Sequence, residues 1–281
     1  MKILLTNDDG FYSAGLRASY EALKDLGEVY VVAPLVQRSA VGRSMSVMEP
    51  IRVSEVYVDD MKVYAVDGTP VDAVIVGIFK VIGETPDLVV SGINLGENLS
   101  TEAVTTSGTV GAALEAASQG SPAIAISQEM DDSEKFEFTF KPHDFSLAKR
   151  TLNWLARLVL ERGMPKGVDV LNVNIPAKFS GEIEITKLAR RLYRTRIEER
   201  LDPRGRKYYW ITGDEVEDAE EGTDIHAIRN GRISITPITI DLTANVDFEE
   251  LRRWLYEGQV ELCQGSCEAN KGRNGARNRE R

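Results

Sequence analysis

The chain has 281 residues, enough to bury one large hydrophobic core or two smaller ones. With 42% hydrophobic and 28% charged residues, its composition excludes a disordered or fibrous protein. The net charge of −10 argues against a general nucleic-acid surface, which needs a basic footprint, and no apolar run approaches the ~18 residues that span a membrane.

The chain ends add two expectations. The N-terminus enters an apolar run at once, without the charged and apolar regions of a signal peptide. We therefore expect a cytoplasmic protein that binds neither a nucleic-acid polymer nor a membrane. The two cysteines, Cys263 and Cys267, lack the second pair that a structural zinc site needs, so we expect free thiols.

The first elements read as strand, helix, strand. The apolar run 3–5 predicts a buried strand, and leucines at three- and four-residue spacing predict a helix over 14–26. Residues 28–33 (EVYVVA) predict a second buried strand, which Pro34 ends. Such a unit builds parallel sheets with a right-handed crossover. The segment 35–48 has little period and predicts a loop at the same sheet edge as the end of the first strand.

The same signals continue along the chain. They predict, in order, two strands within 51–66, a helix at 71–82, a strand at 88–90, a helix ending near 118, a strand at 122–127, a helix at 144–161 and a strand at 168–175.

The last third of the chain differs in pattern. A turn at Asp202 to Gly205, flanked by β-rich arms, predicts a long hairpin over 183–210, which has too little around it to bury its aromatic residues and should pack on a partner subunit. The remaining predictions are a solvated acidic loop at 214–221, a strand at 232–240, a helix at 248–256 and a disordered tail at 264–281.

Polar side chains follow the ends of several predicted strands. Asp8 and Asp9 follow the first strand, and Gly10 lets the backbone turn there. Ser39 lies in the loop after the second strand, and Asn94 follows the third strand of the parallel set. Ligands of open parallel sheets bind outside these strand ends. The oxygen donors, with no histidine or cysteine among them, favour magnesium or manganese, although a solvated turn would also explain the two acids.

Ser107, Gly108 and Thr109 open the next predicted helix. Free backbone amides at a helix N-terminus bind phosphate, and the two hydroxyls add donors. A cation beside an oxyanion site indicates phosphoryl chemistry. An ordinary helix cap with Ser107 at the N-cap position would explain the same residues.

Blocks of residues in a fixed order resemble those of a known family. They are Asn7-Asp8-Asp9-Gly10, Ala33-Pro34 with Ser39, Gly68-Thr69-Pro70-Val71-Asp72, Ser91-Gly92-Ile93-Asn94 with Gly96 and Asn98, Ser107 to Ala113, Asn172 to Pro176, and Ser234 to Pro237 with Asp241 and Thr243. In this combination the chain resembles the SurE family, the metal-dependent survival-protein-E nucleotidases, as far as about residue 243.

The resemblance implies an α/β fold: a Rossmann-like, mostly parallel sheet with flanking helices, a protruding β-hairpin and a C-terminal oligomerisation segment. It implies one divalent cation per subunit, magnesium or manganese, held by Asp8, Asp9, Ser39 and Asn94. The implied activity is hydrolysis of nucleoside 5′-monophosphates in a homodimer or homotetramer that exchanges the hairpin and the C-terminal segment. We accordingly expect a catalytic core at 1–180, an oligomerisation part at 181–263 and a basic tail at 264–281.

The hypothesis for catalysis is attack on phosphorus by an activated water, which Asp8 or Asp9 orients or deprotonates. Asn94 and Asn98 complete the catalytic set. The predicted phosphate-binding residues are Ser107, Gly108 and Thr109. The two histidines, His143 and His226, lie outside every block, and we expect neither to be the general acid.

Other interpretations of the same residues stay open. A phosphatase that forms a covalent phosphate on Asp8 also ends its first strand in aspartates, but there one residue separates the two acids, whereas Asp8 and Asp9 are adjacent. A non-catalytic regulator would use the same metal and phosphate groups without turnover. A glycosyltransferase with a metal-held sugar nucleotide is a third alternative, although nothing in the sequence indicates an acceptor cleft.

Overall fold

The computed structural model describes residues 1–130 and 143–257. The chain divides into two units, Met1–Ile240 and Asp241–Arg281, and each is described by itself. Cys263, Cys267 and the predicted tail lie outside the described residues. No helix of the described residues is long and apolar enough to cross a membrane.

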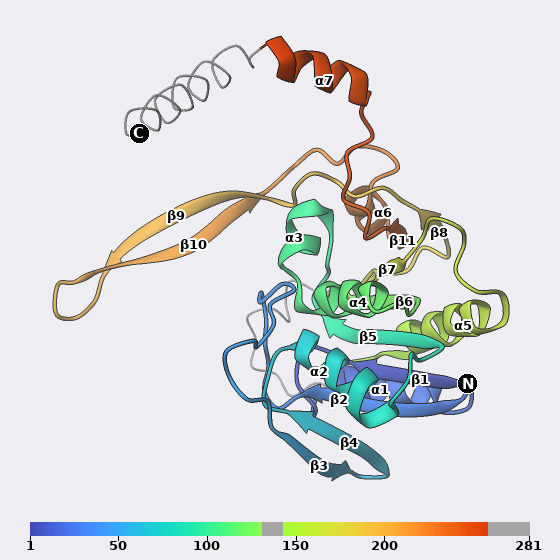
Figure 1. The fold of residues 1–281 in the computed structure, drawn as a ribbon. Coiled ribbons are helices and arrows are strands. Elements are labelled where there is room, and N and C mark those ends of the chain that lie inside the picture. Colours follow the sequence, from blue (N-terminus) through green and yellow to red (C-terminus); the bar gives the residue numbers. More distant parts are fainter. Residues whose placement is uncertain (131–142, 258–281) are drawn as a thin grey trace, which may run out of the picture. The chain divides into compact units, whose positions relative to one another are not determined.

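The first unit is built on a sheet of nine strands in the order β3-β4-β2-β1-β5-β6-β7-β11-β8 (Figure 1). The strands are β1 (Lys2–Thr6), β2 (Glu28–Pro34), β3 (Val53–Val58), β4 (Met61–Val66), β5 (Leu88–Leu95), β6 (Ala123–Gln128), β7 (Val170–Ile175), β8 (Ile183–Ile185) and β11 (Ile233–Ile238). Neighbours from β4 to β7 run parallel, while β3 on β4 and β11 on β7 are antiparallel. The predicted mostly parallel α/β sheet is confirmed.

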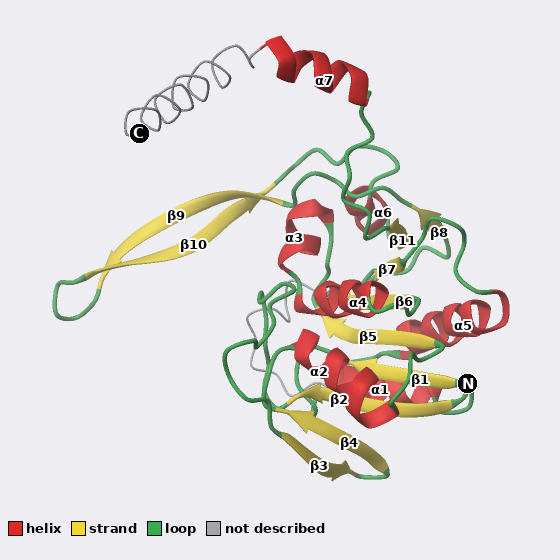
Figure 2. Ribbon diagram, viewed as in Figure 1, coloured by secondary structure: helices red, strands yellow, loops and turns green. Residues whose placement is uncertain are grey.

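Helices cover both faces of this sheet (Figure 2). They are α1 (Ala14–Leu23), α2 (Pro70–Val76), the π-helix η1 (Gly77–Ile82), α3 (Ser100–Thr106), α4 (Gly108–Ser118), α5 (Ser146–Arg162) and α6 (Asp224–Arg229). Side chains alternate along a strand, so Ile3 and Leu5 join the core under α1 and α5, whereas Leu4 joins the core under α2 and α4. Burial on both faces explains the continuous apolar runs.

Several elements differ from their predicted form. The single helix predicted at 71–82 is α2 followed by η1, and at their junction a Cβ on Gly77 would lie 2.6 Å from Leu4 Cδ1. Strand β5 extends past 90 to Leu95, with a register shift between Ser91 and Asn94, so Asn94 belongs to the strand end. The short helices α3 and α6 were not predicted, because six or seven residues are too few for a helical apolar period.

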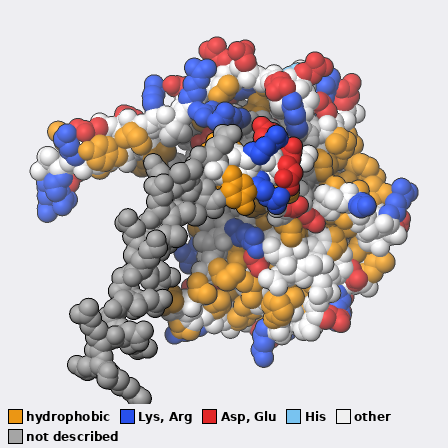
Figure 3. Space-filling model, turned by 45° about the horizontal axis from the view of Figure 1, so that its top comes forward, with side chains coloured by type: hydrophobic (Ala, Val, Ile, Leu, Met, Phe, Trp, Pro, Cys, Tyr) orange, Lys and Arg blue, Asp and Glu red, His pale blue; other side chains and the backbone are white. Residues whose placement is uncertain are grey.

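The hairpin is real but its bounds were wrong. Strands β9 (Tyr193–Leu201) and β10 (Lys207–Glu215) pair only with each other, around the predicted turn at 202–205. The segment 183–185 is instead strand β8 of the main sheet, and the start of the predicted acidic loop belongs to β10. Figure 3 shows hydrophobic side chains along this arm, at the left of the view.

In the second unit, the predicted C-terminal helix is present as α7 (Phe248–Glu257). Its exposed apolar side chains include Leu251 and Trp254. Strands β8 and β11 come from the predicted oligomerisation part and pair within the main sheet. The division of the chain at residue 180 and the oligomerisation role of 181–263 stay predictions.

Candidate active site

The site lies where the order of the parallel strands reverses. From β1 the chain continues to β2 and β4 on one side, and then returns to β5 on the other side of β1. Open α/β sheets bind ligands at such a point, outside the carboxyl ends of the two strands. Asp8 and Asp9 directly follow β1, and Asn94 lies near the end of β5.

The turn after β1 is held by Asn7. Its side chain is fully buried, and its Nδ2 donates to Gly10 O (3.0 Å) and to Ser13 Oγ (2.7 Å). Gly10 has φ +97°, a conformation that other residues rarely adopt. This turn therefore fixes the backbone on both sides of Asp8 and Asp9.

Asp8 faces the start of α4. Its carboxyl group is buried, and Thr109 Oγ1 donates to Asp8 Oδ1 over 2.6 Å. A Cβ on Gly108 would lie 2.7 Å from Asp8 Cβ, so only glycine allows this approach. Ser107 acts as the N-cap, because its hydroxyl accepts from Val110 N. The sequence predicted these three residues as phosphate ligands; in the structure Gly108 and Thr109 lie against the carboxyl group of Asp8.

Burial makes both acids harder to ionise. Burial, opposed by the hydrogen bonds from Thr109 and aided by the charge of Asp9, raises the pKa of Asp8 to about 6. Burial also raises the pKa of Asp9, against a hydrogen bond from the Leu95 amide. A cation beside both groups would favour their charged forms.

The other predicted metal ligands approach Asp9 from two sides. Gln37 Nε2 lies 3.0 Å from Ser39 Oγ and 3.5 Å from Asp9 Oδ1, so it links these two residues. Leu95 N donates to Asp9 Oδ2 over 3.4 Å, next in the chain to Asn94. Asn94 Nδ2 donates to Gly96 O, which orients its side chain.

Asn98 is held by side chains from β6 and β7. Its backbone amide donates to Asn174 Oδ1 (2.8 Å), and its carbonyl accepts from Asn172 Nδ2 (2.9 Å). Its own Nδ2 donates to Ser127 Oγ (2.8 Å) and approaches Thr109 Oγ1 (3.4 Å). The sequence analysis named Asn172 and Asn174 only as part of a family block and gave them no role, and it did not single out Ser127, although polar side chains in otherwise apolar strands were a usable signal.

The loop 35–48 is anchored where it was predicted. Its start is tied to the site by Arg38 N, which donates to Asp8 O (2.7 Å). Farther along, Arg43 forms an ion pair with the buried Glu115 of α4 (2.8 Å), and Ser46 donates twice to the buried Asp72 of α2. These contacts place Ser39 on a loop that is bound at both ends.

The donor set fits a hard divalent cation. Asp8 and Asp9 offer carboxylate oxygens, and Ser39 and Asn94 can add neutral oxygens. Within the described part of the chain, no three His, Cys, Asp or Glu side chains gather in a way that could hold a metal. The site thus depends on two carboxylates and neutral donors. His226 lies on α6 and His143 just before α5, so neither belongs to this donor set.

Comparison with known proteins identifies the family of this chain. The family model described as Survival protein SurE matches residues 3–195. The chain belongs to the SurE family. A relative from Archaeoglobus fulgidus named 5′-nucleotidase SurE is 68% identical over 90% of this chain and 97% of its own length. A protein of the same name from Methanosarcina mazei is 54% identical, again over 90% and 97%.

A solved structure supports the family assignment. The crystal structure of SurE protein from Aquifex aeolicus is 37% identical, covers 92% of this chain and 100% of that chain, and superposes with a TM-score of 0.75. The SurE resemblance and the α/β fold inferred from the sequence are therefore confirmed. The individual roles of the site residues remain to be proposed.

Proposed function

We propose that this chain hydrolyses nucleoside 5′-monophosphates to nucleoside and phosphate, with one divalent cation, magnesium or manganese, per subunit. The observation that supports it best is the pair Asp8 and Asp9 at the switch point of the sheet, beside the N-terminus of α4. The names of the relatives, 5′-nucleotidase SurE, support the substrate class.

Asp8, Asp9, Ser39 and Asn94 would hold the cation. When bound, it neutralises charge on the phosphoryl group and makes a water molecule more acidic. Asp8 is fixed by Thr109 and largely inaccessible, which suits an orienting role. Asp9 is more open to solvent, so we assign it the task of orienting or deprotonating the attacking water.

The other proposed groups act on the phosphoryl oxygens. The backbone of Asn98 is already fixed by hydrogen bonds from β7. Its side chain would therefore need little reorganisation when phosphate binds. Ser107, Gly108 and Thr109 would direct first-turn amides toward the same region. Both the hydroxyl and the backbone amide of Thr109 hydrogen-bond Asp8, so a bound phosphate would have to share these donors with Asp8.

The test is phosphate release from AMP, GMP and p-nitrophenyl phosphate, with manganese, with magnesium and with a chelator. We expect cation-dependent turnover that Asp9→Asn nearly abolishes and that Asp25→Asn, an exposed control, leaves unchanged. A metal-dependent nucleotide affinity without any turnover would favour the regulator instead. Trapping a phosphate on Asp8 would favour the covalent mechanism.

We also propose that the chain works as a homodimer or homotetramer. The hairpin presents Tyr209, Trp210 and Ile211 to solvent, and a two-stranded arm cannot bury them alone. Light scattering should show a lower mass when Tyr209 and Trp210 are changed to serine. The control changes two exposed aromatic residues elsewhere, Tyr57→Ser and Phe79→Ser, and should leave the mass unchanged.

A further inference from the structure

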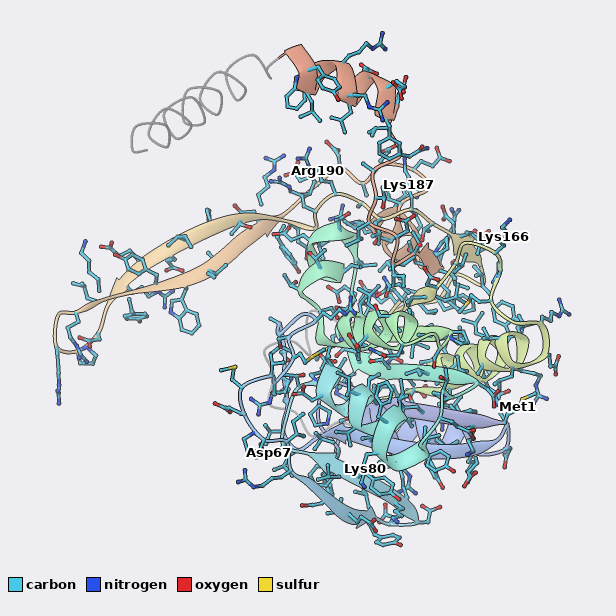
Figure 4. The ribbon with its side chains drawn as sticks, viewed as in Figure 1. Met1, Asp67, Lys80, Lys166, Lys187 and Arg190 are labelled. Atoms are coloured by element: carbon cyan, nitrogen blue, oxygen red, sulfur yellow. The ribbon has the colours of Figure 1, made fainter. Side chains whose placement is uncertain are left out.

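A second cavity lies away from the two acids. It has a volume of about 640 Å³ and is bounded by α3, by the segment 187–191 and by residues 220–223. None of the predicted metal, catalytic or phosphate ligands lines it. Figure 4 labels Lys187 and Arg190, which lie on the segment that passes the first residues of α3.

The cavity wall carries cations whose donors are available. Arg190 and Arg191 both line it, and neither forms an ion pair or side-chain hydrogen bond with residues 1–130 or 143–257. Of the acids in the wall, Glu220 is paired with Lys187 (2.5 Å), while Glu102 accepts from the neutral Thr195 hydroxyl (3.3 Å) and keeps its charge, so the two arginines outnumber the one carboxylate that no cation pairs within the described residues. In a chain of net charge −10, two adjacent unpaired guanidinium groups at a cavity indicate an anionic ligand.

The backbone that carries these arginines is fixed on both sides. Before them, Ala189 N donates to the buried Asp224 (2.9 Å), and Ala189 O accepts from Thr101 N (2.8 Å). After them, Leu192 is buried against Ile225, and its carbonyl accepts from Val216 N (2.9 Å). The arginine Cα positions are therefore set before a ligand arrives, which lowers the entropy lost on binding.

We propose that this cavity is a second ligand site, which binds a multiply charged phosphate anion: inorganic pyrophosphate or the diphosphate group of a nucleotide. Its volume falls within the ~300–1,000 Å³ of small-molecule sites. Guanidinium groups bind phosphate oxygens through paired hydrogen bonds, and Arg190 and Arg191 would supply these donors. The site goes beyond the proposed hydrolysis and needs no divalent cation.

The cavity is also connected to the segment that follows Asn98. Asp224 accepts from Ser100 N (2.6 Å) as well as from Ala189 N, so one buried carboxylate joins the cavity floor to the residue two positions after Asn98. A ligand bound to the arginine segment is therefore connected, through Asp224, to the backbone at Ser100. The contact gives the second site a physical route to the first.

The experiment is calorimetric titration of the full chain with pyrophosphate and with ADP, in a chelator so that no divalent cation is present. We expect one site per chain in the wild type and in Asp9→Asn. Arg190→Gln with Arg191→Gln should weaken binding at least tenfold. The matched control is Arg157→Gln with Arg204→Gln, which removes the same charge from exposed positions outside the cavity and should change affinity less than twofold.

The outcomes separate the possibilities. Equal affinity for pyrophosphate and ADP identifies the phosphate groups as the whole ligand, and tighter ADP binding identifies a nucleotide; both support the site. No binding to the wild type at millimolar ligand overturns it. Equal weakening in the control pair also overturns it, because this would indicate a general charge effect. Loss of binding in Asp9→Asn overturns it as well, because this would place the ligand at the first site. No turnover is measured, so a failure here is distinct from failure of the proposed hydrolysis.

Discussion

Gly108, the first residue of α4, packs directly against Asp8. A Cβ at this position would lie 2.7 Å from Asp8 Cβ, 2.9 Å from Asp8 Oδ2 and 3.1 Å from Arg38 O. Two of these neighbours belong to a buried side chain with no room to rotate away, and the third is backbone. In Gly108→Ala, therefore, either Asp8 or the first turn of α4 must move, and the hydrogen bond between Thr109 and Asp8 stretches.

The size of the effect follows from three terms. Overpacking a buried site costs about 1–3 kcal/mol, and losing a hydrogen bond to a charged group costs about 1.5–3 kcal/mol. Alanine offsets up to about 1 kcal/mol of this through its helix propensity. We expect the free energy of unfolding to fall by about 2–4 kcal/mol. A shift of Asp8 by about 1 Å should lower kcat/KM roughly a hundredfold.

Urea unfolding and phosphate release from AMP measure the two effects. The matched control is Gly77→Ala, whose Cβ would meet Leu4 Cδ1 at 2.6 Å within the core, away from the acids. It should lose comparable stability while each folded molecule keeps its kcat/KM. Full activity in folded Gly108→Ala, or an equal loss of activity in the control, would refute the role given to Asp8.

Three further changes test the surroundings of the site. Thr109→Val keeps the side-chain shape but removes the donor to Asp8, so stability should fall by about 1.5–3 kcal/mol and kcat/KM at least tenfold, unlike Thr151→Val on α5. Asn174→Leu leaves Asn98 N unpaired and should lower kcat tenfold or more, whereas Asn153→Leu, which loses one hydrogen bond to Ala22 O, should keep kcat; equal kcat in both contradicts the role of Asn174. Burial raises the pKa of Asp224, so the unfolded chain releases this proton first as pH rises. The contribution of Asp224 to the free energy of unfolding is therefore complete below about pH 3.9 and declines as pH rises through its raised pKa. Chemical unfolding should show that the difference in this free energy between wild type and Asp224→Asn shrinks as pH rises through this range. A difference that stays constant with pH would exclude this contribution.

The sheet and the position of the acids could be predicted because they follow from local rules. A buried run that ends in Asn7 to Gly10 marks the carboxyl end of a strand, and the crossover rule places the ends of successive parallel strands at one edge. The sequence alone therefore predicted that Asp8, Asp9 and Asn94 lie at that edge. The predicted strand at 88–90 was too short, because Gly92 was taken as the signal of a turn, whereas β5 continues through it to Leu95.

The contacts within the site could not be predicted in this way. Thr109 and Asp8 are 101 residues apart, and nothing in either local pattern says that the helix start faces the acid. The segment 183–185 looked like part of the hairpin because two isoleucines at alternate positions can pair equally well with a neighbouring arm or with β11. Pairing between distant strands depends on the completed sheet, which a local pattern does not contain.

The asparagines of β7 explain why a buried polar cluster persists at this end of the sheet. Asn172 and Asn174 are fully buried, and a polar side chain without partners there would destabilise the fold by about 1–3 kcal/mol. Both instead form hydrogen bonds with the backbone of Asn98. Asn98 lies beyond the end of β5, so its backbone amide and carbonyl form no hydrogen bonds within the sheet. These bonds offset part of the cost of burial, although Asn172 Oδ1 stays buried without a hydrogen-bond partner among the described residues. Apolar residues at these positions would pack as well as the rest of the core but would leave Asn98 N without its acceptor. The buried polar cluster is therefore explained by the need to position the segment at Asn98 rather than by stability.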